Sequence, residues 1–255
     1  MNPETISPAR MPRFRRSETR AMARVIVKQP ADDFQPAAPL PPAVPAPTPS
    51  RMHVLDHPVA QHALTQLRNR HTPSLQFRDN SQQLLLMLTL DAVRNLPTRE
   101  EPVETHRGLH VGQIVAKPVV FFSLYRHGLG LAHSVAGILP GLQAGNISLD
   151  RAPDGQGLEP RMHLHSAPML DTTRVILFDP VIASGNGASL ALQLLRRSGA
   201  TGVTLITFVG SLPGLSRLQS AYPDLQIWTA GIDAELDLKH GPVPGIGNFA
   251  ERLFG

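Results

Sequence analysis

The spacing of apolar residues changes along the chain and divides it into regions. Leucines at helical spacing, at 64–67 and again at 84–96, predict two helices with a break near Pro73 and Asn80. Short apolar runs follow and predict strands at 118–124, 146–150, 162–165, 174–179, 203–209 and 226–230. Helices are expected at 130–139, 188–198 and 213–222. This alternation indicates an α/β domain with a central, mainly parallel sheet flanked by helices.

The first 50 residues do not follow this pattern. They hold 11 of the 25 prolines, and the stretch QPAAPLPPAVPAPTPS is almost wholly proline, alanine and small polar residues. Such a segment cannot bury enough apolar surface to offset the entropy lost on ordering. We therefore expect a disordered Pro- and Arg-rich tail over residues 1–51 and one folded domain over residues 52–255.

Charge follows the same division. The whole chain has a net charge of +4, but residues 1–50 hold seven basic and four acidic side chains, which leaves 17 basic and 16 acidic ones for the rest. The folded part is therefore nearly neutral and lacks the basic surface of a nucleic-acid-binding domain. We expect no nucleic acid to bind the core, while the tail stays a candidate for binding a polyanion.

Composition excludes further classes of protein. The chain has no cysteine, so neither disulfides nor thiolate metal sites can form. No run of about 18 apolar residues occurs, and the first residues lack the apolar core of a secretory signal. We expect a soluble, cytoplasmic protein with no membrane partner.

One segment, at 174–200, carries candidate chemistry: a strand, a small-residue loop and an amphipathic helix. The strand ends in Asp179, and loop 183–187 lets backbone N–H groups converge at the helix start, an arrangement that binds phosphate. The loop lacks the lysine of a P-loop and the third glycine of a Rossmann fingerprint. An acid beside a phosphate loop suits ribose 5-phosphate, with Asp179 accepting from the hydroxyls. An ordinary glycine-rich turn with an Asp helix cap stays an open alternative.

The segment resembles the phosphoribosyl-diphosphate (PRPP) loop of uracil phosphoribosyltransferases, which reads Asp-Pro-Met-Leu-Ala-Thr-Gly-Gly followed by Ser or Thr. Residues 179–187, DPVIASGNG, match it with few changes. SLYRHGLG at 123–130 is similar to the family's Pro-Ile-Leu-Arg-Ala-Gly-Leu-Gly. VPGIGNFAERLFG at 243–255 is similar to Val-Pro-Gly-Leu-Gly-Asp-Ala-Gly-Asp-Arg with its trailing Phe-Gly, and WTAGID at 228–233 resembles the strand before it. The resemblance covers about residues 52–255.

The resemblance implies a type I phosphoribosyltransferase fold with a small hood, and a β-arm that follows Arg151. It implies transfer of the 5-phosphoribosyl group from PRPP to uracil, which gives UMP and pyrophosphate. Magnesium (Mg²⁺) would be bound together with PRPP and would have no direct protein ligand. The chain would form a homo-oligomer, either a dimer or a tetramer.

The resemblance also assigns site residues. Asp179 and Arg126 would be catalytic, with Asp179 at the ribose and Arg126 pairing its planar donor fork with the diphosphate. PRPP would contact Arg126, Arg151, Asp179, Pro180, Val181, Ile182, Ala183, Ser184, Gly185, Asn186, Gly187 and Asn248. For Arg151, a surface arginine in a Pro/Gly-rich loop stays the alternative. Uracil would contact Pro242, Gly247, Asn248 and Phe249, largely through main-chain groups.

Several residues depart from the family pattern inside these motifs. Asn248 replaces an Asp, Pro242 an aliphatic residue, His127 an Ala, and Asn186 a Gly. Gly187 stands where the family has Ser or Thr, so one loop hydroxyl is lost. The changes leave two alternatives open: a phosphoribosyltransferase acting on another pyrimidine or an unusual heterocycle, and a non-catalytic module that senses PRPP or a nucleotide.

Overall fold

A computed structural model of the chain describes residues 51–139, 141–151, 157–163, 170, 173–238 and 240–255. Most of the predicted tail lies outside the described residues, so the boundary at residue 51 stays a prediction. Within the described ranges, the strands form one main sheet and two separate two-stranded ribbons. No helix of these ranges is long and apolar enough to cross a membrane.

The main sheet is almost entirely parallel, as predicted. Its strand order is β1-β10-β9-β7-β4-β5-β6, with β8 also paired to β9, and only the β5–β6 pair is antiparallel. The strands are β1 (Met52–Val54), β4 (Val119–Leu124), β5 (Gln143–Arg151), β6 (Leu158–His163), β7 (Arg174–Phe178), β8 (Val181–Ile182), β9 (Val203–Ser211) and β10 (Gln226–Asp233). Because parallel strands point the same way, the residues that follow β4, β7 and β9 meet at one edge of the sheet.

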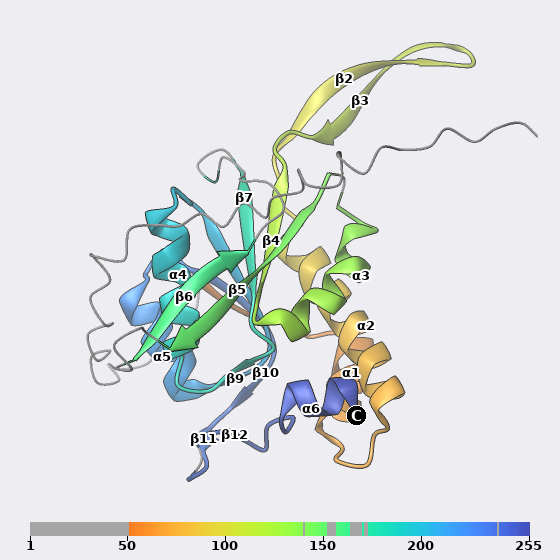
Figure 1. Cartoon of the computed structure of the whole chain (residues 1–255). Coiled ribbons are helices and arrows are strands. Elements are labelled where there is room, and N and C mark those ends of the chain that lie inside the picture. The colour runs from red at the N-terminus through yellow and green to blue at the C-terminus, as the bar shows by residue number, and fades with distance from the viewer. Residues whose placement is uncertain (1–50, 140, 152–156, 164–169, 171–172, 239) are drawn as a thin grey trace, which may run out of the picture.

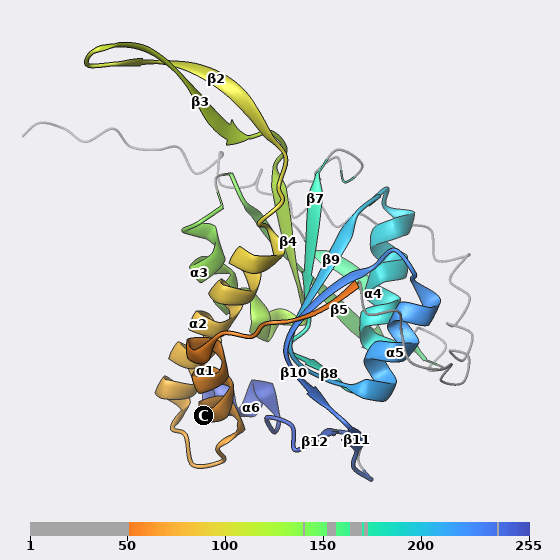
Figure 2. The ribbon, with the colours of Figure 1, turned by 180° about the vertical axis from the view of Figure 1, so that it is seen from behind.

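Helices cover both faces of this sheet (Figures 1 and 2). One face carries α1 (Pro58–Arg68), α2 (Ser74–Ala92), α3 (Ala132–Ala136) and α6 (Phe249–Phe254), and the other carries α4 (Asn186–Arg197) and α5 (Leu212–Ala221). Strand β4 shows why two faces are needed, because every one of its residues is buried. Val119 and Phe121 pack in one hydrophobic cluster, while Val120, Phe122 and Leu124 pack in the other.

The first two helices confirm the predicted break at Pro73, which caps α2, but the prediction for Asn80 is wrong. Asn80 lies inside α2, where its side-chain amide donates to the Gln76 carbonyl at 2.7 Å. This bond satisfies a polar side chain within the helix, so Asn80 does not end it. The predicted helix at 130–139 is also shorter than expected, since a 3₁₀ segment, η3 (Arg126–Leu131), precedes α3.

The arm of the molecule is a hairpin that the sequence pattern does not predict. Strands β2 (Thr98–Thr105) and β3 (Gly108–Val115) pair along their whole length and project from the body (Figures 1 and 2). Nearly all of their residues are exposed, so no alternation of buried and exposed positions marks them. The arm expected after Arg151 falls in part on residues 152–156, which lie outside the described residues, so it stays a prediction; β6, which follows them, pairs antiparallel with β5.

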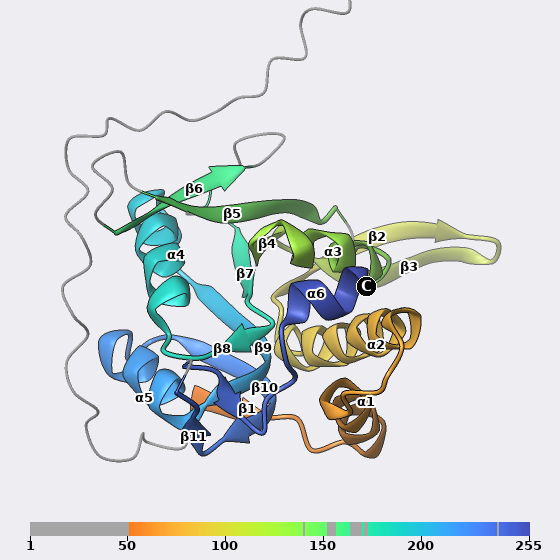
Figure 3. The same cartoon turned by 60° about the horizontal axis from the view of Figure 1, so that its bottom comes forward.

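The hood is the C-terminal segment that leaves β10. It consists of the ribbon β11 (Glu235–Leu236) and β12 (Pro242–Val243), a short loop, and α6. Helix α6 lies against α2 (Figure 3), where Arg78 donates to the Leu253 carbonyl at 3.0 Å. The loop between β12 and α6 is thereby held near the edge of the sheet at which β4 and β7 end.

Candidate active site

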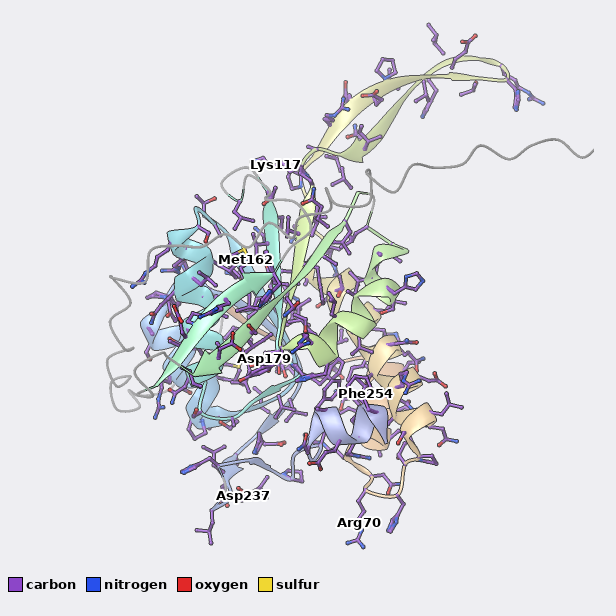
Figure 4. All side chains as sticks on the ribbon, viewed as in Figure 1. Arg70, Lys117, Met162, Asp179, Asp237 and Phe254 are labelled. Carbon is purple, nitrogen blue, oxygen red and sulfur yellow. The ribbon has the colours of Figure 1, made fainter. Side chains whose placement is uncertain are left out.

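Asp179 stands directly after β7, the central strand between β4 and β9 (Figure 4). Its N–H continues the sheet by donating to the Ile206 carbonyl at 3.0 Å, and the residue is only 8% exposed. Burial raises the pKa of this carboxyl to about 7, although the backbone N–H of Val181 acts in the opposite direction by hydrogen bonding to the carboxylate. When ionised, a carboxylate in this position is a strong acceptor for hydrogen bonds from the hydroxyls of a ligand.

The loop after Asp179 leads into α4 through Gly185, whose φ of 80° and ψ of −1° lie in the left-handed region. No side chain caps α4, so its first N–H groups are available to a ligand. The Asn186 N–H has only a long bond, 3.4 Å, to the Ser184 hydroxyl. The loop therefore presents unpaired donors and the positive end of a helix dipole to the same space.

Helix α5 holds this loop from behind. The Ser211 hydroxyl donates to the Ala183 carbonyl at 2.6 Å, and Arg217 donates to the Ser184 carbonyl at 3.4 Å. Gly214 allows the approach, because a Cβ at this position would lie 2.0 Å from the Ala183 carbonyl oxygen. Because the Ala183 and Ser184 carbonyls accept these hydrogen bonds, the loop is fixed before any ligand binds.

A pocket lies between the loop and the end of β4. It is lined by Tyr125, Asp179, Val181, Ile182, Ala183, Ser184, Gly185, Gly187 and Ala188. The predicted residues of the phosphate loop thus converge, except that Pro180 and Asn186 belong to the loop without lining the pocket. Among the described lining residues, Asp179 carries the only carboxylate.

The two predicted arginines are not part of the pocket wall. Arg126 begins η3 immediately after Tyr125, is exposed, and forms no ion pair within the described part of the chain. Arg151 ends β5, and its side chain lies outside what the structure describes. An exposed, unpaired guanidinium beside the pocket is available to a phosphate group.

The predicted base-contacting residues lie on the hood. The ring of Phe249 is buried and packs with Phe77 and Phe208, so only the main chain of this residue is left for a ligand. The Asn248 side chain caps α6 by accepting from the Glu251 N–H at 3.4 Å. Gly247 has a φ of 72°, and Pro242 opens the short strand β12.

Rings connect the hood to the pocket. The His127 ring lies 5.5 Å from that of Phe249 and 5.5 Å from that of Tyr125, measured between ring centroids. Burial lowers the pKa of His127, so its imidazole is neutral at pH 7. These contacts bring residues 125–127 and the C-terminal motif together, through side chains that differ from those of the family pattern.

Arg68 and Asp233 fix the hood loop at its other end. Arg68 donates to both carboxylate oxygens of Asp233, at 2.7 and 3.2 Å, and to the Gly245 carbonyl at 3.0 Å. The Gly245 N–H donates to the same carboxylate at 2.8 Å. The Asp233 side chain is 1% exposed, so this network is a buried and satisfied one. Sequence reasoning did not find either residue, since neither belongs to a loop motif.

Tyr125 and Ala188 are the described lining residues that sequence reasoning missed, and of the two only Tyr125 has a polar side chain. For Tyr125 the backbone is also unusual. Its backbone has φ 67° and ψ 159°, a region that almost only glycine adopts. Burial, followed by the charge of Asp179, raises the pKa of its phenol. The available signal was its position directly before Arg126, where the family motif has Leu.

The described residues contain no group of three or more His, Asp or Glu side chains that could hold a metal ion. A single buried carboxylate beside the loop fits a Mg²⁺ ion that arrives on a phosphorylated ligand. Such an ion is coordinated mainly by water and by the phosphate oxygens of the ligand, so it needs few protein ligands.

Comparison with known proteins places the chain in a family. A family model described as uracil phosphoribosyltransferase matches residues 54–255. A uracil phosphoribosyltransferase of Dictyoglomus turgidum is 33% identical over 204 residues, which cover 79% of this chain and 98% of that protein. One from Caulobacter sp. (strain K31) is 35% identical over 204 residues, covering 79% and 97%.

A solved structure shows the same fold. The AQ2163 protein from Aquifex aeolicus superposes with a TM-score of 0.72 at 23% identity, covering 80% of this chain and 97% of that one. The predicted fold is confirmed over the same region of the chain that carries the motifs.

Proposed function

The chain belongs to the uracil phosphoribosyltransferase family, and on that premise we propose that it transfers the 5-phosphoribosyl group of PRPP to uracil, giving UMP and pyrophosphate. The observation that carries the proposal is the pocket in which a buried acid, Asp179, faces a preformed phosphate loop. A ligand with a phosphate and vicinal hydroxyls satisfies both parts at once. The alternative of an ordinary glycine-rich turn does not explain why the acid is buried in the same pocket.

In this proposal, the loop N–H groups of residues 184–188 bind the 5′-phosphate, and Asp179 accepts hydrogen bonds from the ribose hydroxyls. Arg126 and Arg151 bind the departing diphosphate. A Mg²⁺ ion bound with PRPP would neutralise charge on that diphosphate. The residues of the protein therefore contribute mainly by positioning PRPP and stabilising the leaving group, and bond cleavage at C1′ needs no protein nucleophile.

The base is placed by the hood loop, through main-chain groups of Pro242, Gly247, Asn248 and Phe249. The Arg68–Asp233 network fixes this loop at Gly245, and the Phe249 ring anchors it in the core. Fixed carbonyl and N–H groups suit a ring such as uracil, which carries both donors and acceptors.

One observation favours a second candidate, a phosphoribosyltransferase for a different ring. Pro242 has no backbone N–H, whereas the aliphatic residue that it replaces has one. A base that offers no acceptor at that place would then fit as well as uracil.

The exposed arm supports a further part of the proposal, a homo-oligomer, because Val103, Leu109, Val111 and Ile114 stand exposed on β2 and β3. A cytoplasmic location stays a proposal that rests on composition.

Pyrophosphate release tests the function. The full chain is incubated with PRPP, Mg²⁺ and one base from a panel of uracil, cytosine, thymine, orotate and other heterocycles. We expect release with uracil that stops when PRPP, Mg²⁺ or the base is left out. Release with a different ring but not with uracil would establish the second candidate, and none with any ring would contradict an enzymatic role.

A further inference from the structure

Tyr125 is the described pocket-lining residue that belongs neither to the segment 179–187 nor to α4. This residue comes from the junction of β4 and η3 and lines the pocket together with Asp179, Ser184 and Gly187. Its side chain is partly exposed at the pocket, with 37% of the residue accessible. No described residue hydrogen-bonds its hydroxyl, although the ring is held against His127 with an interplanar angle of 20°.

The backbone of Tyr125 is held in its strained conformation from both sides. Its N–H donates to the Ile147 carbonyl at 2.8 Å, and its carbonyl accepts from the Ser123 hydroxyl at 2.9 Å. A conformation of this kind is unfavourable for a residue with a side chain and persists where the surroundings impose it. The main chain and the ring are therefore both fixed before any ligand arrives, and the hydroxyl is held at the pocket.

The hydroxyl stands next to Gly187, at the start of α4. A Cβ built on Gly187 would lie 3.4 Å from the Tyr125 oxygen, 3.2 Å from Leu149 Cδ1 and 3.4 Å from Leu124 Cδ2. The family loop has Ser or Thr at position 187 and Leu at position 125, so the two departures meet at one place in space. Position 187 has lost a hydroxyl, and Tyr125 has gained one next to the same place.

We propose that the Tyr125 hydroxyl donates a hydrogen bond to the 5′-phosphate of PRPP, in place of the loop hydroxyl that Gly187 lacks. The proposal rests on the proposed function, because it takes PRPP as the ligand. The phenol can donate at any pH near neutrality, since its pKa is raised and the proton stays on the oxygen. Tyr125 is thus an additional substrate-binding residue, and its target is the phosphate and not the diphosphate.

The test measures binding by titration calorimetry, with full-length protein and three probes: PRPP with Mg²⁺, ribose 5-phosphate, and diphosphate with Mg²⁺. We expect Tyr125→Phe to weaken PRPP and ribose 5-phosphate by the same factor, roughly tenfold or more, as for a lost hydrogen bond to a charged group. Its affinity for diphosphate should equal that of the wild type. Equal binding of ribose 5-phosphate by wild type and Tyr125→Phe would overturn the inference and leave the proposed function standing.

The other tyrosine supplies a matched control. The Tyr222 hydroxyl is buried and bonded to the Ser189 hydroxyl at 2.9 Å, so Tyr222→Phe should lower the melting temperature without changing phosphate affinity. Equal losses of affinity in both variants would mean a general effect on α4 and would overturn the inference. If the wild type binds neither PRPP nor ribose 5-phosphate, the proposed function fails and this inference fails with it.

Moving the hydroxyl back gives a second test. Tyr125→Leu should lose affinity for ribose 5-phosphate, and the double variant Tyr125→Leu/Gly187→Ser should recover most of it, to within about threefold of the wild type. The new Cβ needs only a small shift of the Leu149 methyl group, since their separation would be 3.2 Å. If the double variant melts like the wild type but binds ribose 5-phosphate as weakly as Tyr125→Leu does, the proposed exchange of hydroxyls between positions 187 and 125 is contradicted.

Discussion

The two ends of the candidate site are built in different ways. Except for Tyr125, the phosphate end is one contiguous stretch, 179–187, and the side chains that hold it come from α5 and the end of β9, such as Ser211, which is 28 residues away in the chain. The base end, the hood loop at 242–249, is held by Arg68, which donates to a carbonyl 177 residues later. The first end is specified locally and the second by the tertiary fold.

The difference explains where the chain departs from the family pattern. The phosphate loop keeps its acid, and its departures at Asn186 and Gly187 preserve the tight turn and the helix start, which act through backbone geometry. The aromatic residues Tyr125, His127 and Phe249 lie between the two ends and contact one another. Side chains in that region can change together as long as the contacts between them are kept.

The largest expected effect comes from removing the acid at the phosphate end. Asp179→Asn keeps the shape of the carboxyl but loses its charge, and should lower turnover at least about 100-fold, as for other buried charged hydrogen-bond partners. Pyrophosphate release is the measurement. Asp150→Asn, an exposed acid on β5, serves as the control and should keep wild-type activity. Near-normal turnover in Asp179→Asn would remove the acid from the site.

A smaller effect is expected when the support behind the loop is disturbed. In Gly214→Ala, the new methyl group would collide with the Ala183 carbonyl oxygen, so the loop must move away from α5. PRPP affinity should fall roughly 30-fold, because a displacement of about 1 Å is costly in a preorganised site. Gly112→Ala on the arm is the control, since its Cβ would meet nothing closer than 3.8 Å. Titration calorimetry measures the affinity of each variant for PRPP. Equal affinities of Gly214→Ala and Gly112→Ala would mean that α5 does not position the loop.

Breaking the network at the base end should affect uracil and spare PRPP. Arg68→Ala leaves the buried Asp233 carboxylate without its cation, so the KM for uracil should rise about tenfold and the fold should lose roughly 2–3 kcal/mol. Arg94→Ala breaks an ion pair of the same length, 2.7 Å, but Arg94 is 75% exposed and little stability should be lost. A parallel rise in the KM for PRPP would show that the two ends are not independent.

The pKa of Asp179 predicts opposite effects of pH on binding and on stability. Ribose hydroxyls bind the ionised acid, so affinity for ribose 5-phosphate should rise with pH up to about 7, by roughly tenfold per pH unit below that value. The unfolded carboxyl titrates near pH 4, so between about 4 and 7 the folded state binds the extra proton. Stability should therefore decrease as pH rises through this window.

Thermal melting at pH 5 and pH 8 measures the stability side of this prediction. In Asp179→Asn the contribution disappears, so the variant should melt above the wild type at pH 8 by several degrees and match it more closely at pH 5. The phosphate group of ribose 5-phosphate also titrates near pH 6. In Asp179→Asn, the dependence of ribose 5-phosphate affinity on pH reports this titration alone. Identical pH profiles for the two proteins would contradict a raised pKa at this acid.

The smallest effect is expected between the two ends. His127→Ala restores the family residue but removes a ring that contacts both Tyr125 and Phe249. The KM values for PRPP and uracil should each rise by about threefold, as for the loss of one aromatic contact. Steady-state kinetics with each substrate varied in turn would show this, and a change confined to one substrate would mean that the ring serves only one end.

The sequence predicts well what is local. Six of the eight strands that the structure describes in the main sheet, the break at Pro73 and the phosphate loop follow from short patterns of residues that are neighbours in the chain, whereas the short strands β1 and β8 were not predicted. The arm was missed because its strands are exposed on both faces and leave no burial pattern. The Arg68–Asp233 network was missed because its members are 165 residues apart. Tyr125 was missed because its contact with Gly187 depends on how the end of β4 meets the start of α4.

In the proposed function, one pocket, formed by Asp179 and the phosphate loop, makes a nucleotide from PRPP and uracil. Chromatography of the products of a reaction with full-length protein, PRPP, Mg²⁺ and uracil tests it most directly. We expect UMP and pyrophosphate in equal amounts from the wild type, and neither from Asp179→Asn. Pyrophosphate without UMP, or UMP at the same rate from both proteins, would contradict it.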